Sequence, residues 1–287
     1  MNSSVATRPL ISVALVVGAM AACGQRSTGP TEPGALAAAA NDVVFADDFE
    51  SGTLSAWQDG VDPSRQRVVT DPKGAKSGSR YLAVTYPAGR DGGWLTRFLM
   101  PGYQSMDVSY DVRFPAGWQG ATKLVALYGS RIDNQWSGFG KSGVCPNGTD
   151  FFAAMLVTES GNPGAVRFYT YYPAMAREPD GVTCFGRYGD GTGSEHTVLA
   201  DYTSSTALSP DAWHHVELSV RLNTPGRSDG TQMFWIDGVQ QAIWSGLSFR
   251  TSEVLRLNAV QLTFNSANGA ARTEELDVDN VVVRASS

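Results

Sequence analysis

The chain has 287 residues, 42% of them hydrophobic, and its formal net charge at pH 7 is −6. This apolar content is sufficient for a globular core and excludes an intrinsically disordered chain. The acidic balance also excludes the strongly basic surface with which proteins usually bind nucleic acid. We therefore expect a globular protein, and nucleic acid is not among its predicted partners.

The first 22 residues have the pattern of a bacterial secretory signal. A single cation, Arg8, precedes an apolar segment from Leu10 to Ala22, and Cys23 follows directly. The segment has 13 residues, fewer than the roughly 20 that a membrane-spanning helix needs. A cysteine after small residues resembles a lipobox, in which the mature chain begins with an acylated cysteine. We predict lipidation of Cys23 and a cell-envelope protein held, at the outer membrane, by this lipid alone; secretion after an ordinary signal peptide is the alternative.

After this signal, residues 23–42 are the lipidated cysteine and a predicted flexible linker, rich in Gly, Pro, Ser, Thr and Ala. From residue 43 the sequence changes to short alternating or β-branched runs separated by turn residues. In 106–114, apolar and polar residues alternate throughout, which is the period of a half-buried β-strand. Further strands are predicted at 43–50, 166–172, 214–222, 233–236, 259–264 and 276–283.

The pattern after residue 43 predicts the fold class. No segment there has a convincing helical period, and short strands recur regularly between turns. This favours an all-β sandwich of two antiparallel sheets, built as one domain over residues 43–287. We expect the first and last strands to pair with each other, and the protein to be a monomer.

The cysteine count predicts one disulfide. If Cys23 carries lipid, Cys145 and Cys184 remain as an even pair in a compartment that permits disulfides. A bridge between them would close a loop of about 40 residues, worth on the order of 3–4 kcal/mol in the chain-entropy model. No Cys or His spacing suggests a zinc site, so we predict no metal among the catalytic groups.

Several segments resemble the concanavalin A-like jelly rolls of secreted carbohydrate-active proteins. They are Phe49–Trp57, Trp213–Val216, Trp235–Gly238 and Asp279–Val283. The resemblance implies that the sandwich is a jelly roll. It does not separate enzymes from lectins and binding modules, because these share the same elements.

Four other segments resemble polysaccharide lyase family 14, whose members cleave alginate or glucuronan. In the family's order they are Tyr110–Phe114, then Lys123-Leu124 with Leu127–Gly129, then Tyr169-x-Tyr171 with Pro173, then Arg221–Asn223 with Asp229-Gly230. By this resemblance Tyr169 and Tyr171 match the family's catalytic tyrosines, and Lys123 its active-site lysine. The chain also departs from the family: 151–156 lacks the Ser-x-Arg that precedes the tyrosines.

The residues themselves suit the chemistry of a uronate lyase. Such an enzyme neutralises the sugar carboxylate, removes the C5 proton and protonates the leaving O4. Tyrosine has a pKa near 10, so a tyrosine base needs a neighbouring cation. Period two places Arg167, Tyr169 and Tyr171 on one strand face, about 7 Å apart. We assign Lys123 and Arg167 to carboxylate neutralisation, and the two tyrosines to base and acid in either order.

The predicted function is therefore a polysaccharide lyase that cleaves a uronic-acid polysaccharide by β-elimination. The alternative is a non-catalytic carbohydrate-binding jelly roll, in which aromatic rings stack on sugars and Lys123 and Arg167 hold carboxylates. A glycoside hydrolase ranks last, because the strands carry no paired-carboxylate pattern. The predicted partner in either of the first two cases is an acidic polysaccharide.

The lyase chemistry requires no cofactor, but a structural calcium ion is a possibility. Carboxylates gather in the sequence near both ends of the domain, and hard oxygen ligands suit calcium. They are Asp47, Asp48, Glu50, Asp277 and Asp279. The other interpretation of these residues is that they are ordinary surface and turn carboxylates.

Overall fold

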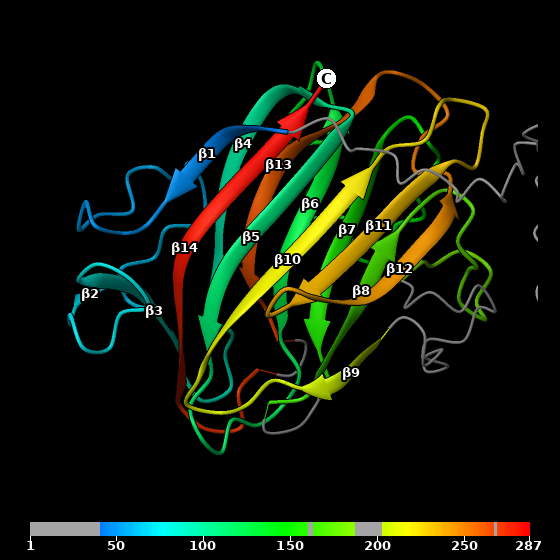
Figure 1. Ribbon diagram of the computed structural model, residues 1–287. Helices are drawn as coiled ribbons and strands as arrows, with labels where there is room; N and C mark the ends of the chain where they lie inside the picture. The colour runs from blue at the N-terminus through cyan, green and yellow to red at the C-terminus, as the bar shows by residue number, and fades with distance from the viewer. Residues whose placement is uncertain (1–40, 160–162, 187–202, 267–268) are drawn as a thin grey trace, which may run out of the picture. The chain divides into compact units, whose positions relative to one another are not determined.

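The computed structural model describes residues 41–159, 163–186, 203–266 and 269–287 (Figure 1). The predicted signal, the lipidation at Cys23 and nearly all of the predicted linker lie outside the described residues. The first strand begins at Asp42, next to the predicted start of the domain. Within the described residues no helix is long and apolar enough to cross a membrane.

The strands of the described residues form two antiparallel sheets, as the alternation predicts. The eight-stranded sheet has the order β12-β11-β10-β5-β14-β3-β2, and β1 pairs with β14. Its strands are β1 (Asp42–Asp47), β2 (Gln66–Thr70), β3 (Arg80–Tyr86), β5 (Ser105–Arg113), β10 (Trp213–Arg221), β11 (Gly230–Ile236), β12 (Val239–Leu247) and β14 (Glu274–Ser286). The pairing of β1 with β14 confirms the predicted union of the first and last strands.

The six-stranded sheet has the order β4-β13-β6-β7-β8-β9. Its strands are β4 (Gly93–Tyr103), β6 (Lys123–Arg131), β7 (Phe151–Thr158), β8 (Ala165–Tyr171), β9 (Thr203–Ala207) and β13 (Leu255–Phe264). Figure 1 shows β5, β10 and β14 in front of β6, β7 and β13, so the two sheets are layered face to face. This is the jelly-roll sandwich that the resemblance implies.

The core lies between the two sheets and follows the predicted period of two. In β5, Met106, Val108, Tyr110 and Val112 are buried in the core, and the residues between them belong to the other face. Across the interface, the Phe168 ring of β8 meets the Phe234 ring of β11 edge to face, with centroids 5.1 Å apart. Each such fully buried ring contributes roughly 1.5–3 kcal/mol relative to an exposed one.

The register of β6, β7 and β8 determines what gathers on the outer face of the six-stranded sheet. Three rows of facing residues run across these strands: Lys123–Val157–Arg167, Ala126–Met155–Tyr169 and Tyr128–Ala153–Tyr171. A bulge between Lys123 and Val125 shifts the register, so Lys123 and Ala126 both belong to these rows. The sequence alternation in β8 therefore brings both predicted tyrosines onto the sheet face that also carries the predicted lysine.

Candidate active site

Strand β8 presents Arg167, Tyr169 and Tyr171 away from the core. The intervening residues point inward, where Phe168 packs against β11 and the Thr170 hydroxyl donates to Gln232 Oε1 at 3.1 Å. This inward anchoring fixes the rotation of the strand. The predicted row of one cation and two phenols is thus held on the outer sheet face by core packing.

The two tyrosines and the lysine form one cluster, which we call the Lys–Tyr cluster (Lys123, Tyr169 and Tyr171). The two phenol oxygens are 3.3 Å apart, and the rings meet edge to face with centroids 5.6 Å apart. Lys123 Nζ lies 5.5 Å from the centroid of the Tyr169 ring, within the range of a cation–π contact. A cation and two phenols therefore converge at one point of the sheet.

Burial separates the two tyrosines, which the sequence treats alike. Tyr171 is only 5% exposed, whereas Tyr169 is partly exposed. Burial raises the pKa of Tyr171, and hydrogen bonds with the Tyr169 hydroxyl, the Gly186 amide and the Ser142 side chain offset this only in part. Tyr171 is consequently a protonated phenol at neutral pH and can donate a proton.

Lys123 is a partly buried cation, and no carboxylate of the described residues forms an ion pair with it. Burial lowers the pKa of its ammonium, and the Asp91 charge opposes this shift without cancelling it. In the described part of the chain Lys123 forms no ion pair. Desolvation of an unpaired charge costs free energy, which an incoming carboxylate would recover.

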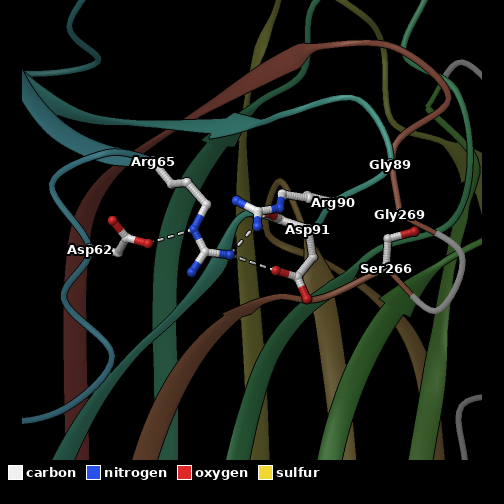
Figure 2. Close-up of a pocket in the computed structure, with 7 residues that line it drawn as sticks. All are labelled: Asp62, Arg65, Gly89, Arg90, Asp91, Ser266 and Gly269. Atoms are coloured by element: carbon white, nitrogen blue, oxygen red, sulfur yellow. Dashed lines mark hydrogen bonds and ion pairs between the residues drawn. The ribbon is translucent and has the colours of Figure 1, made fainter.

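A polar pocket is formed by loops next to the strands β2, β4 and β13 (Figure 2). The Lys123 amide donates to the Asn265 carbonyl oxygen at 2.9 Å, and Asn265 Nδ2 donates to Asp91 Oδ2 at 2.7 Å. Asp91 is one of the residues that line the pocket. The start of β6 and the pocket wall are therefore joined by two hydrogen bonds.

Arg167 lies in the same row as Lys123, with Val157 between them. Its Nη1 forms an ion pair with Glu159 Oε1 at 2.9 Å, and its side chain is 18% exposed. The positive charge of Arg167 is therefore partly neutralised by a carboxylate of the protein itself. Lys123 Nζ lies 5.5 Å from the Tyr169 ring centroid, and Arg167 lies two residues before Tyr169 on the same strand face.

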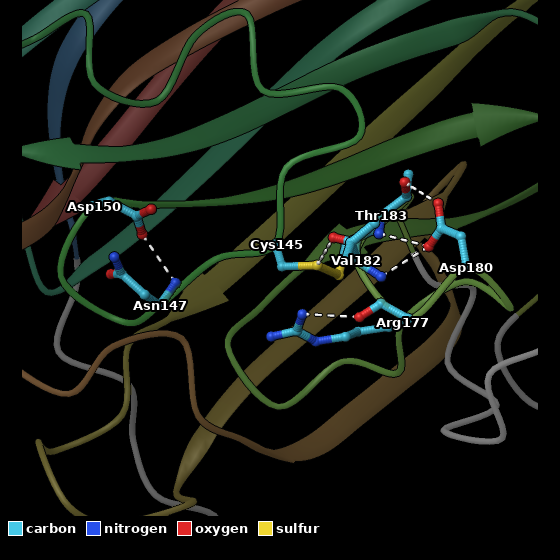
Figure 3. The surroundings of a disulfide bond; sticks show 9 residues. Cys145, Asn147, Asp150, Arg177, Asp180, Val182 and Thr183 are labelled. Carbon is cyan, nitrogen blue, oxygen red and sulfur yellow. Dashed lines mark hydrogen bonds between the residues drawn. A yellow bond between two sulfur atoms is a disulfide. The ribbon is translucent and has the colours of Figure 1, made fainter.

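A disulfide holds the loops that cover the tyrosines. The predicted Cys145–Cys184 bond is present and joins the β6–β7 connection to the segment after β8 (Figure 3). The Cys184 amide also donates to the Gly143 carbonyl oxygen at 3.2 Å. Because Ser142 and Gly186 lie close in sequence to these points, the bond fixes both groups that donate to the Tyr171 hydroxyl.

Gly186 is a site residue that the sequence analysis missed. A Cβ at this position would lie 2.6 Å from the Tyr169 ring, so only glycine allows the backbone to reach both tyrosines. The available signal was its place two residues after Cys184, because a bridged cysteine fixes its neighbours. Nothing in the local sequence indicates which side chains Gly186 contacts.

The stretch 151–156, which lacks the Ser-x-Arg expected from the resemblance, lies in β7, and β7 pairs with the tyrosine strand β8. Strand β7 directs Ala153 and Met155 to the outer face, opposite Tyr171 and Tyr169. The side chains that β7 places on this face, Ala153 and Met155, are therefore apolar.

The carboxylates considered for calcium have other partners. Asp47 accepts from the Trp57 ring at 2.8 Å, and Asp277 forms an ion pair with Arg113 at 2.8 Å. Asp279 accepts backbone amides at 2.8–3.1 Å, and so does Glu50, at 2.6 Å. Among the described residues, no group of three or more His, Cys, Asp or Glu could hold a metal ion. Calcium binding stays a prediction without support from this arrangement.

A comparison with protein families places most of this sandwich in one family model. The model described as Polysaccharide lyase 14 matches residues 76–269, which include the whole Lys–Tyr cluster. A search of curated proteins found no significant match.

Solved structures with the same fold include several lyases. An alginate lyase from Chlorella virus, vAL-1, has a TM-score of 0.60 at 15% identity, covering 85% of this chain and 100% of that one. An endo-β-1,4-glucuronan lyase from the fungus Trichoderma reesei has a TM-score of 0.54 at 14% identity, covering 85% and 96%. The alginate lyase Aly36B, as a lysine and tyrosine double mutant with bound alginate tetrasaccharide, has a TM-score of 0.56 at 17% identity, covering 80% and 86%. At these identities the likeness establishes the jelly-roll fold.

Proposed function

Because the chain belongs to polysaccharide lyase family 14, we propose that it cleaves a uronic-acid polysaccharide, of the alginate or glucuronan type, by β-elimination. The observation that carries this proposal is the Lys–Tyr cluster on the outer face of the six-stranded sheet. The printed substrates of the similar structures, alginate and glucuronan, support an acidic polysaccharide.

The first step is neutralisation of the sugar carboxylate. The Lys123 ammonium has no competing ion pair in the described part of the chain and is partly buried, so it binds a carboxylate at low solvation cost. Withdrawal of the carboxylate charge makes the C5 proton more acidic. A lysine cation can perform this role without a metal.

The second step is proton removal by Tyr169. This phenol is the more exposed of the pair, and the Lys123 ammonium lies 5.5 Å from its ring centroid, where a positive charge favours the phenolate. The phenolate takes the C5 proton, and the electrons of the C5–H bond form the C4=C5 double bond as the C4–O4 bond breaks.

The third step is protonation of O4 by Tyr171, whose raised pKa keeps it protonated. Tyr169 then carries the proton from C5, and Tyr171 has lost one to O4. The 3.3 Å distance between the two oxygens allows this proton to pass from Tyr169 to Tyr171. The transfer restores the starting state without an external acid or base.

The test is release of unsaturated uronate from alginate and from glucuronan, followed by the ultraviolet absorbance of the new double bond. We expect Tyr169→Phe to lose about 10²–10⁴-fold in kcat, the usual contribution of a general base. Tyr171→Phe should lose less, because water can supply a proton to O4 more easily than it can replace the base. Equal loss in both variants would contradict the assignment of roles.

A non-catalytic sugar-binding role is the second candidate, and one observation favours it. The stretch 151–156, which by resemblance matches the family's Ser-x-Arg strand, has neither Ser nor Arg. A binding protein would release no unsaturated product from any polyuronate yet would still bind it. Tyr169→Phe would then leave affinity within about twofold, since a phenyl ring retains the stacking face.

We also propose that the protein acts in the cell envelope, held by acylation of Cys23. The support is the sequence pattern up to Ala22. Cys23→Ser should move the protein from the membrane fraction to the soluble fraction, and mass spectrometry of the wild-type amino terminus should show the lipid. An unmodified terminus after cleavage would contradict this.

A further inference from the structure

The pocket beside Lys123 is built from loops at one end of the sandwich (Figure 2). Its volume is about 520 Å³, and it is open to solvent. It is lined by Asp62, Arg65, Gly89, Arg90, Asp91, Ser266 and Gly269. These residues come from the segment before β2, the β3–β4 loop and the β13–β14 connection, so none of them belongs to the Lys–Tyr cluster.

The two carboxylates of the pocket are already used within the protein. Asp62 accepts from Ser64 and from Arg65 Nε, the latter at 2.8 Å. Asp91 accepts from Arg65 Nη1 at 2.8 Å, from the Gly93 amide at 3.1 Å and from Asn265 at 2.7 Å. Their oxygens are therefore occupied, and their charges hold Arg65 in place.

The polar groups left for a ligand are hydrogen-bond donors. Within the described residues, the Arg90 guanidinium, the Ser266 hydroxyl and Arg65 Nη2 have no hydrogen-bond partner. Arg90 is exposed, and Figure 2 shows its guanidinium on the same side of the pocket as that of Arg65. A pocket whose acceptors are occupied and whose donors are unused suits an anion that carries several acceptor oxygens.

We propose that this pocket is a subsite for the carboxylate of a uronosyl unit next in line beyond the sugar held at Lys123. The inference rests on the proposed function. It concerns a sugar unit of the substrate other than the one that reacts. Arginine binds carboxylates with paired N–H donors, and a serine hydroxyl suits a carboxylate or ring oxygen. The Lys123 backbone amide is joined through Asn265 to Asp91 of the pocket wall, and the Asp91 charge acts on the Lys123 ammonium, so the pocket lies near the lysine of the Lys–Tyr cluster.

A subsite away from the reacting bond contributes equally to ground state and transition state. Its loss therefore raises KM and leaves kcat unchanged. It also acts only on chains long enough to reach it. Dependence on chain length is thus the signature that distinguishes the subsite from a general surface charge.

The experiment measures KM and kcat for Arg90→Ala on a ladder of polyuronate oligosaccharides, from trisaccharide to polymer. We expect KM to rise about tenfold on the longer chains, the loss of one charged hydrogen-bonded contact, with kcat unchanged and no effect on the shortest chains. Ser266→Ala should give a smaller change of the same kind. The matched control is Arg221→Ala, an exposed arginine on the eight-stranded sheet, which should change nothing.

Two outcomes would overturn the subsite: an unchanged KM at every chain length, or an equal rise in KM at every chain length and in the Arg221→Ala control.

Gel retardation by alginate and glucuronan distinguishes a failure of the subsite from a failure of the proposed function. A wild type that is retarded but does not cleave would refute the lyase and leave the subsite, provided that Arg90→Ala lowers retardation. A wild type that cleaves, with equal retardation of Arg90→Ala, would refute the subsite alone. A wild type that is neither retarded nor active would refute both.

Discussion

The outer faces of the two sheets both carry ion-paired arginines, and Lys123 on the six-stranded sheet differs from them. On the eight-stranded sheet Arg113 pairs with Asp277 at 2.8 Å, and His215 pairs with Asp111 at 3.1 Å. On the six-stranded sheet Lys123 has no ion pair within the described residues, and its neighbours are phenols. Charges that are neutralised inside the protein stabilise it, whereas a charge left unpaired is available to a ligand.

The Arg113 site shows what a stabilising arrangement looks like. Its guanidinium lies 4.7 Å from the Trp213 ring centroid and 5.5 Å from that of Tyr81. Burial raises the pKa of Asp277, and the ion pair with Arg113 opposes that shift. Arg113 Nε and Nη2 both donate to Asp277 Oδ2, at 2.9 and 2.8 Å, so the charge of this arginine is neutralised within the protein.

The largest expected effect comes from removing the cation on each face in turn. Lys123→Ala should lower kcat/KM by about 10²–10⁴-fold, because preorganised electrostatic stabilisation is lost, while the free energy of unfolding stays the same or rises. Arg113→Ala should keep kcat/KM within about twofold and lower the free energy of unfolding by about 1–3 kcal/mol, since Asp277 loses its partner. Enzyme assays and urea titrations of the two variants measure both effects.

The opposite effects of these two substitutions on activity and stability would contradict the proposed difference between the two sheet faces. If Arg113→Ala lost activity without losing stability, the substrate would have to contact the eight-stranded sheet. If Lys123→Ala unfolded at much lower urea than the wild type, Lys123 would be a structural residue. Lys123→Met keeps the aliphatic stem and separates loss of packing from loss of charge.

Gly186→Ala should give the next largest effect. The new Cβ would lie 2.6 Å from the Tyr169 ring, so the ring or the disulfide-linked segment must move. A displacement of about 1 Å in a reacting group can cost about 10²-fold, and we expect a loss of about 10–10²-fold in kcat. The thermal midpoint should change little, because the segment lies on the outer face. Unchanged kcat would mean that Tyr169 has room to turn and that the disulfide does not position it.

The sequence predicts the elements that depend on local alternation. The nine alternating residues of 106–114 correspond to β5, and the Arg-x-Tyr-x-Tyr pattern of β8 faces outward as expected. It does not predict β7, which is buried on both faces and so has no alternation to detect. Nor does it separate Tyr169 from Tyr171, because the Tyr171 hydroxyl receives hydrogen bonds from Ser142 and Gly186, which lie in separate segments near the two cysteines of the disulfide.

The residues that line the pocket could not be predicted from the sequence, for the same reason. Arg65, Arg90 and Ser266 come from three separate loops, and only the closing of the sandwich brings them together. Single arginines in loops are usually solvated surface residues, so no local pattern marks them. Local sequence patterns therefore cannot predict a site whose residues are brought together only by contacts between distant parts of the chain.

The smallest expected effect is a shift in pH dependence, and it tests the lysine face most specifically. Burial lowers the pKa of Lys123 from its ordinary value of 10.5, so its charge is lost at a lower pH than that of an exposed lysine. Because catalysis needs the cation, kcat/KM should fall as the pH rises through this lowered pKa of the free enzyme. Lys123→Arg keeps a cation whose pKa exceeds about 12, so its alkaline limb should move to higher pH even if its maximum rate is lower. An alkaline limb that stays at the same pH in Lys123→Arg would assign that titration to another group and remove the charge of Lys123 from the mechanism.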